Sequence, residues 1–137
     1  MEKLTTNTPV KLTKDLIKGF AGGLLAKGFD EPAPIPLAHE EWWEMCCSDH
    51  KYVAIAAPRG HAKTTAVTKT YTLAANLFRE HDFVLLVADT YNQGCLFLGE
   101  IKRELLQNED LIELFELERE LVVDRENDII VEAKDGH

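Results

Sequence analysis

Two short apolar runs, separated by a helical pattern, constrain the fold of this chain more than any other feature. Residues 52–57 (Tyr-Val-Ala-Ile-Ala-Ala) and 83–88 (Phe-Val-Leu-Leu-Val-Ala) are continuously apolar, which is typical of strands buried on both faces. Between them, from Lys63 onward, apolar residues recur at helical spacing. Because strands that alternate with helices usually pair in parallel, the pattern predicts an α/β fold whose parallel sheet is flanked by helices.

Helical spacing and prolines predict the structure before the first run. Apolar residues recur every three or four positions over residues 12–24 and again over 38–47, so both segments are expected to be helical. Three prolines within residues 30–36 exclude a helix there and predict a stiff connector. Residues 1–11 are polar and are expected to be loose.

After the second run, the pattern predicts two more helices and a hairpin. Thr90 and Gln93 form a T-x-x-Q capping box, which is typical of a helix N-terminus. A short helix is expected at residues 111–115. The apolar segments 121–123 and 129–131 lie on either side of an acidic turn and predict an antiparallel hairpin. The complete pattern is therefore α/β, with N-terminal helices and a C-terminal acidic hairpin.

The negative charge of the chain is concentrated near its C-terminus. The formal net charge is −9, and residues 100–137 contain 13 acidic and 5 basic residues. Residues 1–99 are consequently close to neutral. Neither part has the basic stripe of a nucleic-acid-binding domain, so direct DNA binding by this chain is not expected. No run approaches the roughly 20 apolar residues of a membrane span, and no secretion signal is expected.

The cysteines indicate reduced thiols. Cys46 and Cys47 are adjacent and Cys95 is the third, an odd number that does not suggest a disulfide framework and that favours a cytosolic protein. Cys46, Cys47 and His50 have side chains that bind zinc, but no second CxxC or HxxxH motif completes a tetrahedron. We therefore expect buried thiols that pack as small apolar side chains.

The segment that carries chemistry is residues 57–65, Ala-Pro-Arg-Gly-His-Ala-Lys-Thr-Thr, between the first apolar run and the next helix. Its spacing matches the phosphate-binding pattern G-x-x-x-x-G-K-[ST], except that Ala57 and Ala62 replace the two glycines. In such a loop, backbone N–H groups surround phosphate oxygens, the lysine reaches the β- and γ-phosphates, and the next hydroxyl binds Mg²⁺. These roles fall to Lys63 and Thr64. The alternative is an ordinary connection between strand and helix, in which Lys63 and Thr64 are surface residues of the first helical turn.

This nine-residue loop resembles the variant Walker A loop of tailed-phage terminase large subunits, in which A-P-R-G-H-[AG]-K-[ST] is common. Residues 36–42 are similar to the family's segment that precedes the loop and helps to hold adenine. Residues 87–93 and 101–108 are similar to its second strand and the helix that follows. The resemblance covers about residues 36–115, and its specific part is the loop.

The resemblance implies a partial P-loop NTPase domain of the ASCE type at residues 36–137, preceded by an N-terminal helical segment and connector at residues 1–35. It implies ATP and Mg²⁺ as ligands, with Thr64 binding the metal that accompanies the nucleotide. The other residues implied to contact the nucleotide are Pro58, Gly60, His61, Ala62, Lys63 and Thr65.

Two further roles follow from the resemblance. Arg59 stands where packaging motors carry an arginine proposed to sense or stabilise the γ-phosphate, and a guanidinium suits the charge on phosphoryl oxygens. The alternative is a surface arginine paired with a nearby carboxylate. His39 is implied to hydrogen-bond the adenine edge, and the alternative is a structural histidine whose hydrogen bonds are satisfied within the fold.

Hydrolysis by this class requires a Walker B strand ending in aspartate and a further carboxylate that orients water. The run at 83–88 leads to Asp89, but it is the wrong strand by order and lacks the second acid. By the resemblance, the chain ends before the Walker B strand and the nuclease domain, so we expect weak ATP binding and no turnover. In the parent motor the implied partners are double-stranded DNA, the portal protein and the small terminase subunit, in the cytoplasm of a bacterial host.

Two other functions remain open from the sequence. The first is a remnant of another P-loop NTPase, such as a helicase-like protein. The second is a non-catalytic interaction module that docks on a phage assembly partner through its acidic C-terminal part.

Overall fold

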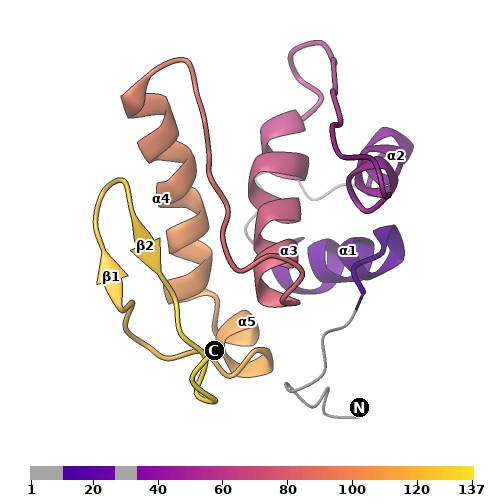
Figure 1. The fold of residues 1–137 in the computed structure, drawn as a ribbon. Helices are drawn as coiled ribbons and strands as arrows, with labels where there is room; N and C mark the ends of the chain where they lie inside the picture. The colour runs from indigo at the N-terminus through magenta and orange to yellow at the C-terminus, as the bar shows by residue number, and fades with distance from the viewer. Residues whose placement is uncertain (1–10, 27–33) are drawn as a thin grey trace. The chain divides into compact units, whose positions relative to one another are not determined.

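The computed structural model describes residues 11–26 and 34–137, and these fall into two compact units, Lys11–Val84 and Leu85–His137. Helices predominate in both units, and the sheet found among the described residues has two antiparallel strands (Figure 1). None of the helices in this part of the chain is long and apolar enough to cross a membrane. The domain boundary expected at residues 35/36 stays a prediction.

The first unit begins with the helix predicted at residues 12–24, which the structure confirms with slightly different bounds. Helix α1 spans Lys14–Phe20 and continues directly into the π-helical segment η1, Ala21–Leu25. The side chain of Thr13 caps α1 by accepting a hydrogen bond from the Leu16 N–H, at 3.3 Å. This cap satisfies one of the N–H groups that a helix start leaves without an intrahelical acceptor.

The second predicted helix is also present, as α2, Leu37–Cys46. Two ion pairs connect it with α1, Lys14–Glu44 at 3.3 Å and Lys18–Glu40 at 2.9 Å. All four side chains keep some exposure, so pairs of this kind contribute about 0–1 kcal/mol each. Burial of apolar side chains contributes more, and these include Ile17 and Phe20 of α1 and Trp42 and Trp43 of α2.

The helix predicted from Lys63 forms as a π-helical segment η3, Thr64–Tyr71, which continues into α3, Thr72–Leu77. Helix α2 packs against η3. At this contact Trp43 is only 2% exposed, and its indole N–H donates to the Ala66 carbonyl at 2.8 Å. A buried indole nitrogen needs such a partner, because an unsatisfied buried donor costs about 1–3 kcal/mol.

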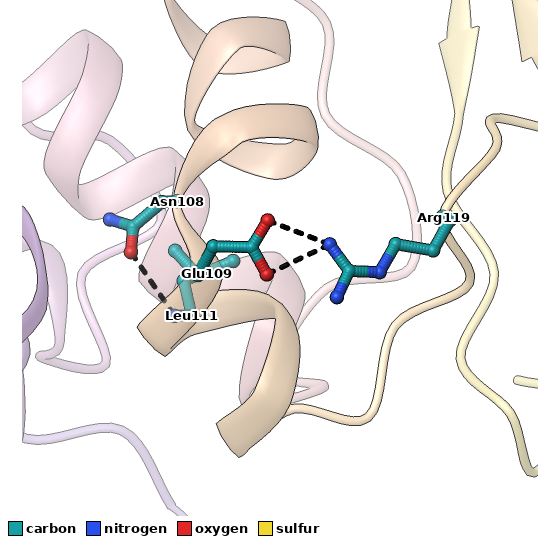
Figure 2. A network of polar contacts seen from close by, with 4 residues as sticks. All are labelled: Asn108, Glu109, Leu111 and Arg119. Atoms are coloured by element: carbon teal, nitrogen blue, oxygen red, sulfur yellow. Dashed lines mark hydrogen bonds and ion pairs between the residues drawn. The ribbon is translucent and has the colours of Figure 1, made fainter.

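The second unit contains α4, Tyr91–Gln107, and α5, Glu109–Leu114. Thr90 caps α4 as the capping box predicts, accepting from the Gln93 N–H at 3.2 Å. Asn108 links the two helices, since its side chain accepts from the Leu111 N–H at 3.1 Å and its amide donates to Glu104 at 2.9 Å. Figure 2 shows this cap beside an ion pair in which one Arg119 nitrogen contacts both carboxylate oxygens of Glu109, at 2.7 and 2.8 Å.

The predicted acidic hairpin is confirmed, with shorter strands than expected. Strand β1, Val123–Asp124, pairs antiparallel with β2, Ile129–Ile130, so that Val123 lies opposite Ile130 and Asp124 opposite Ile129. An ion pair between Lys102 of α4 and Asp124 holds the hairpin beside the helix. An isolated bridge between Leu117 and Ala133 extends the antiparallel pairing beyond the strands.

The predicted parallel sheet is wrong. Residues 52–57 and 83–88 have no strand partner within the described part of the chain, and the fold is mostly helical, not a parallel-sheet P-loop NTPase domain. Several apolar side chains of these runs are exposed: Tyr52 is 84% exposed, Phe83 79% and Val87 85%. The physical reason is that an apolar run indicates only that a segment tends to be buried. A parallel sheet also requires a second strand that forms hydrogen bonds with the first.

Two other expectations fall wholly or partly on residues that the structure leaves undescribed. Residues 1–10 of the segment expected to be loose lie outside the described ranges, as do residues 27–33, which include most of the proline connector. Within the described part, Pro36 has an extended backbone and precedes the first residue of α2. This position suits proline, which cannot donate a backbone hydrogen bond.

Candidate functional site

Residues 57–63 form a loop in the first unit that leads into the helix η3–α3. Two of its residues have left-handed backbones, Gly60 with φ 87° and Ala62 with φ 50°. The next residue, Lys63, is already right-handed, with φ −57° and ψ −43°. An alternation of left-handed and right-handed residues turns successive backbone N–H groups toward one concave side, which is a common anion-binding arrangement.

Ala62 occupies the position of the second glycine in the phosphate-binding pattern. A left-handed backbone favours glycine, because any Cβ crowds the following carbonyl at a cost of roughly 1–2 kcal/mol. Ala62 nevertheless adopts this conformation. The alanine thus has a backbone conformation that glycine adopts more readily. Ala57, which replaces the first glycine, has no positive φ and needs no such freedom.

The first N–H groups of the helix that follows the loop have no intrahelical acceptor. The Ala66 N–H is the first to make a helical bond, donating to the Ala62 carbonyl at 2.9 Å. By helix geometry, the N–H groups of residues 62–65 precede the first intrahelical donor. Together with the positive end of the helix dipole, they form a cradle suited to a phosphate or another anion.

Lys63 lies across this loop. Its Nζ donates to the Ala57 carbonyl at 3.3 Å, and the side chain is exposed. A single weak contact to a neutral carbonyl is easily exchanged for a charged phosphate oxygen, because charge-assisted hydrogen bonds are roughly twice as strong. The ammonium group is therefore placed to receive an anion at the mouth of the loop. Thr64 and Thr65, the next two residues, are half-buried at the start of η3.

His39 is brought to the loop from α2. Its Nε2 lies 2.8 Å from the carbonyl oxygen of His61, and its ring stacks at a tilt on Trp42 with centroids 5.0 Å apart. A structural histidine is the alternative to an adenine ligand, and this contact is of the kind that a structural histidine makes. The adenine contact itself stays a prediction.

The other residues that the sequence analysis assigned to the nucleotide are in the same loop. Pro58, Arg59, Gly60 and His61 are exposed, so their accessibility permits contact with a ligand. The γ-phosphate role of Arg59 stays a prediction. One contact was not predicted from the sequence, the hydrogen bond from Trp43 to the Ala66 carbonyl at the start of the helix. Its signal was the spacing of four between His39 and Trp43, which places them on one face of α2.

Cys46, Cys47 and Tyr71 lie close together where α2 meets η3. The Tyr71 hydroxyl donates to the Cys46 carbonyl at 3.2 Å. Burial raises the pKa of Cys47 to about 11, with smaller contributions from Cys46 and Glu80, and burial likewise raises the pKa of Tyr71 to about 12. The pKa of Cys46 is also raised by burial. These groups therefore stay neutral near pH 7, and the three cysteines of the chain are free thiols.

Metal binding by the protein alone finds no support in the described segments, where no group of three or more His, Cys, Asp or Glu is arranged to hold an ion. The Mg²⁺ assigned to Thr64 would accompany a nucleotide, so it stays a prediction. Comparison with models of protein families, with curated proteins and with solved structures finds no match for this chain. The resemblance to terminases therefore stays a prediction, which depends on the residues of the loop and its flanking segments.

Proposed function

We propose that this chain is the ATP-binding portion of a phage terminase large subunit, the motor that packages viral DNA. The observation that carries the proposal is the loop of residues 57–63, in which Ala62 adopts a left-handed backbone directly before a helix start. This geometry provides the N–H cradle that a phosphate requires, although the alanine departs from the general pattern. The support lies in the loop and its residues, and not in the fold.

Each residue of the loop has a role in this proposal. The N–H groups of residues 62–65 receive phosphate oxygens, and Lys63 exchanges the Ala57 carbonyl for the β- and γ-phosphates. The Thr64 hydroxyl binds the Mg²⁺ that accompanies ATP, and Arg59 contacts the γ-phosphate. The proposal is limited to nucleotide binding, and hydrolysis by this chain is not part of it. Double-stranded DNA, the portal protein and the small subunit are partners of the whole motor in a bacterial cytoplasm.

A second candidate function is favoured by one observation. Large apolar side chains are exposed in residues 52–57 and also in residues 83–88, and exposed apolar side chains are typical of interaction sites. They would add an apolar contact to the alternative of a non-catalytic module that docks on an assembly partner through its acidic C-terminal part. A helicase-like remnant would share the loop chemistry of the first proposal, so it predicts the same nucleotide binding.

The test is the binding of ATP with Mg²⁺ to the full chain, measured by isothermal titration calorimetry. We expect weak binding by the wild type and a loss of about tenfold or more in Lys63→Ala, since a charge-assisted contact is removed. The matched control is Lys134→Ala, which deletes a positive charge that is also exposed, in the second unit. Equal ATP binding by the wild type and Lys63→Ala contradicts the proposal. Binding of an assembly partner that survives Lys63→Ala and ignores ATP favours the docking module.

A further inference from the structure

The contact between His39 and the loop determines which ring nitrogen carries the proton. A carbonyl oxygen only accepts hydrogen bonds, so at 2.8 Å the Nε2 of His39 must be the donor to the His61 carbonyl. The neutral ring is therefore the Nε2–H tautomer. Because Nε2 donates its hydrogen bond to the backbone of the loop, it cannot donate the same bond to the edge of a base.

The same contact sets the direction of a backbone N–H group. In a planar trans peptide, the carbonyl of one residue and the N–H of the next point in opposite directions. Because His39 holds the carbonyl oxygen of His61, the N–H of Ala62 points away from α2. This N–H is the first of the cradle formed by residues 62–65, and it belongs to the residue whose left-handed backbone shapes the loop.

A second hydrogen bond fixes the same helix to the start of η3. Trp43, four residues after His39 on α2, donates its indole N–H to the Ala66 carbonyl at 2.8 Å. The two donors lie on one face of α2, and their acceptors lie on either side of Lys63. The hydrogen bond of Trp43 is buried, whereas that of His39 is exposed. His39 therefore makes the more accessible of the two hydrogen bonds between α2 and the loop.

We propose that His39 is a positioning residue that holds the loop in its phosphate-receiving shape, and this proposal rests on the proposed function above. His39 acts on the ligand only through the backbone of His61 and Ala62. Its effect must therefore be the same for every ligand that carries the phosphate chain. A contact with adenine would instead distinguish ATP from other nucleotides and from a ligand that has no base.

The test compares two variants of the full chain. His39→Gln keeps an N–H donor at a similar distance along the side chain, whereas His39→Phe keeps a ring against Trp42 and removes the donor. We expect His39→Phe to weaken the binding of ATP, GTP and tripolyphosphate by a common factor of about three to ten, the value of one hydrogen bond. We expect His39→Gln to bind all three within about twofold of the wild type.

Two readouts need no ligand. Amide hydrogen exchange at residues 60–65 should be faster in His39→Phe than in the wild type, with unchanged exchange across α4, residues 91–107, as the internal control. The ¹⁵N shifts of the His39 ring in the wild type should show the proton on Nε2. Both readouts report on the loop of the free protein.

The outcomes separate this inference from the proposed function. Weakened binding of ATP alone, with GTP and tripolyphosphate unaffected, overturns the positioning role in favour of an adenine contact. Unchanged exchange at residues 60–65 in His39→Phe also overturns it. If the wild type and Lys63→Ala bind all three ligands equally, the proposed function fails. In that case the exchange and the ring shifts still decide whether His39 holds the loop.

Discussion

Ala62 carries a backbone strain that a glycine at the same position would not have. Its φ of 50° places the Cβ against the following carbonyl, at a cost of roughly 1–2 kcal/mol. Ala62→Gly removes this strain but adds conformational freedom to the unfolded chain, which costs about 0.4–1 kcal/mol. We expect a net gain of about 0.5–1 kcal/mol in the free energy of unfolding, measured by urea denaturation.

Gly60 provides the matched control for this prediction. Its φ of 87° is further into the region that side chains avoid, and a Cβ added there meets no atom within 4 Å. Gly60→Ala therefore tests the backbone alone, without a packing clash, and should lower the free energy of unfolding by about 1 kcal/mol. A destabilised Ala62→Gly together with a neutral Gly60→Ala contradicts the assignment of left-handed backbones in this loop.

For single residues, the sequence pattern proposes members of the candidate site but contains no information about how they are arranged. The run of residues 57–65 identified Lys63 and Thr64 through their spacing, which is a local property. The hydrogen bond from His39 to His61 joins residues 22 positions apart. Such a contact depends on how α2 packs against the loop, which no local spacing encodes.

Where α2 meets η3, ionisation is predicted to destabilise the fold at alkaline pH. The pKa of Cys47 is raised from 9.0 to about 11 and that of Tyr71 from 10.0 to about 12, in both cases mainly by burial. Between these values the folded chain binds more protons than the unfolded chain, so the free energy of unfolding falls as pH rises. The stabilisation is fully present below pH 9 and is lost progressively between about pH 9 and 12.

Urea denaturation at a series of pH values checks this prediction. We expect the midpoint to fall above pH 9 in the wild type, and to fall less steeply in Cys47→Ser and in Tyr71→Phe, which each remove one of the two ionisations. Tyr71→Phe also removes the hydrogen bond to the Cys46 carbonyl, so at pH 7 it should be less stable by about 1 kcal/mol. An identical pH slope in all three proteins is the contrary result.

At the scale of the element, helices were predictable because their signals are local. Apolar residues at helical spacing predicted α1 and α2 to within a few residues, and the Thr90 cap predicted the start of α4. The hairpin was predictable for the same reason, since a short acidic turn joins its strands. Asn108, which caps α5, was not assigned this role, although asparagine is among the preferred N-cap residues.

At the scale of the whole molecule, the prediction failed where structure depends on distant partners. The runs at residues 52–57 and 83–88 have the composition of buried strands, but neither run pairs with a strand within the described ranges. A parallel strand is stable only when a neighbour supplies its hydrogen bonds and covers its faces. The composition of one segment contains no information about whether that neighbour is present.

The exposed apolar runs predict that the chain associates with itself. Leu85 and Val87 are 72% and 85% exposed, and alternate residues of an extended segment present their side chains together. Exposed apolar segments with unpaired backbone groups are typical sites of association. In sedimentation velocity we expect the wild type to exceed its monomer mass of 15.5 kDa increasingly as concentration rises. The double substitution Leu85→Lys and Val87→Lys should remain close to that mass.

The control for this last prediction separates apolar surface from charge. Asn92→Lys with Asn127→Lys adds the same two positive charges at exposed polar positions and leaves residues 83–88 intact. Both double variants reduce the net charge from −9 toward neutrality, a change that by itself weakens the repulsion between copies. If apolar surface drives association, the control should associate at least as strongly as the wild type, and Leu85→Lys with Val87→Lys should not. Because all four positions are exposed, the free energy of unfolding should stay within about 0.5 kcal/mol of the wild type. A wild type that is monomeric at every concentration contradicts the prediction, as does equal association by both double variants.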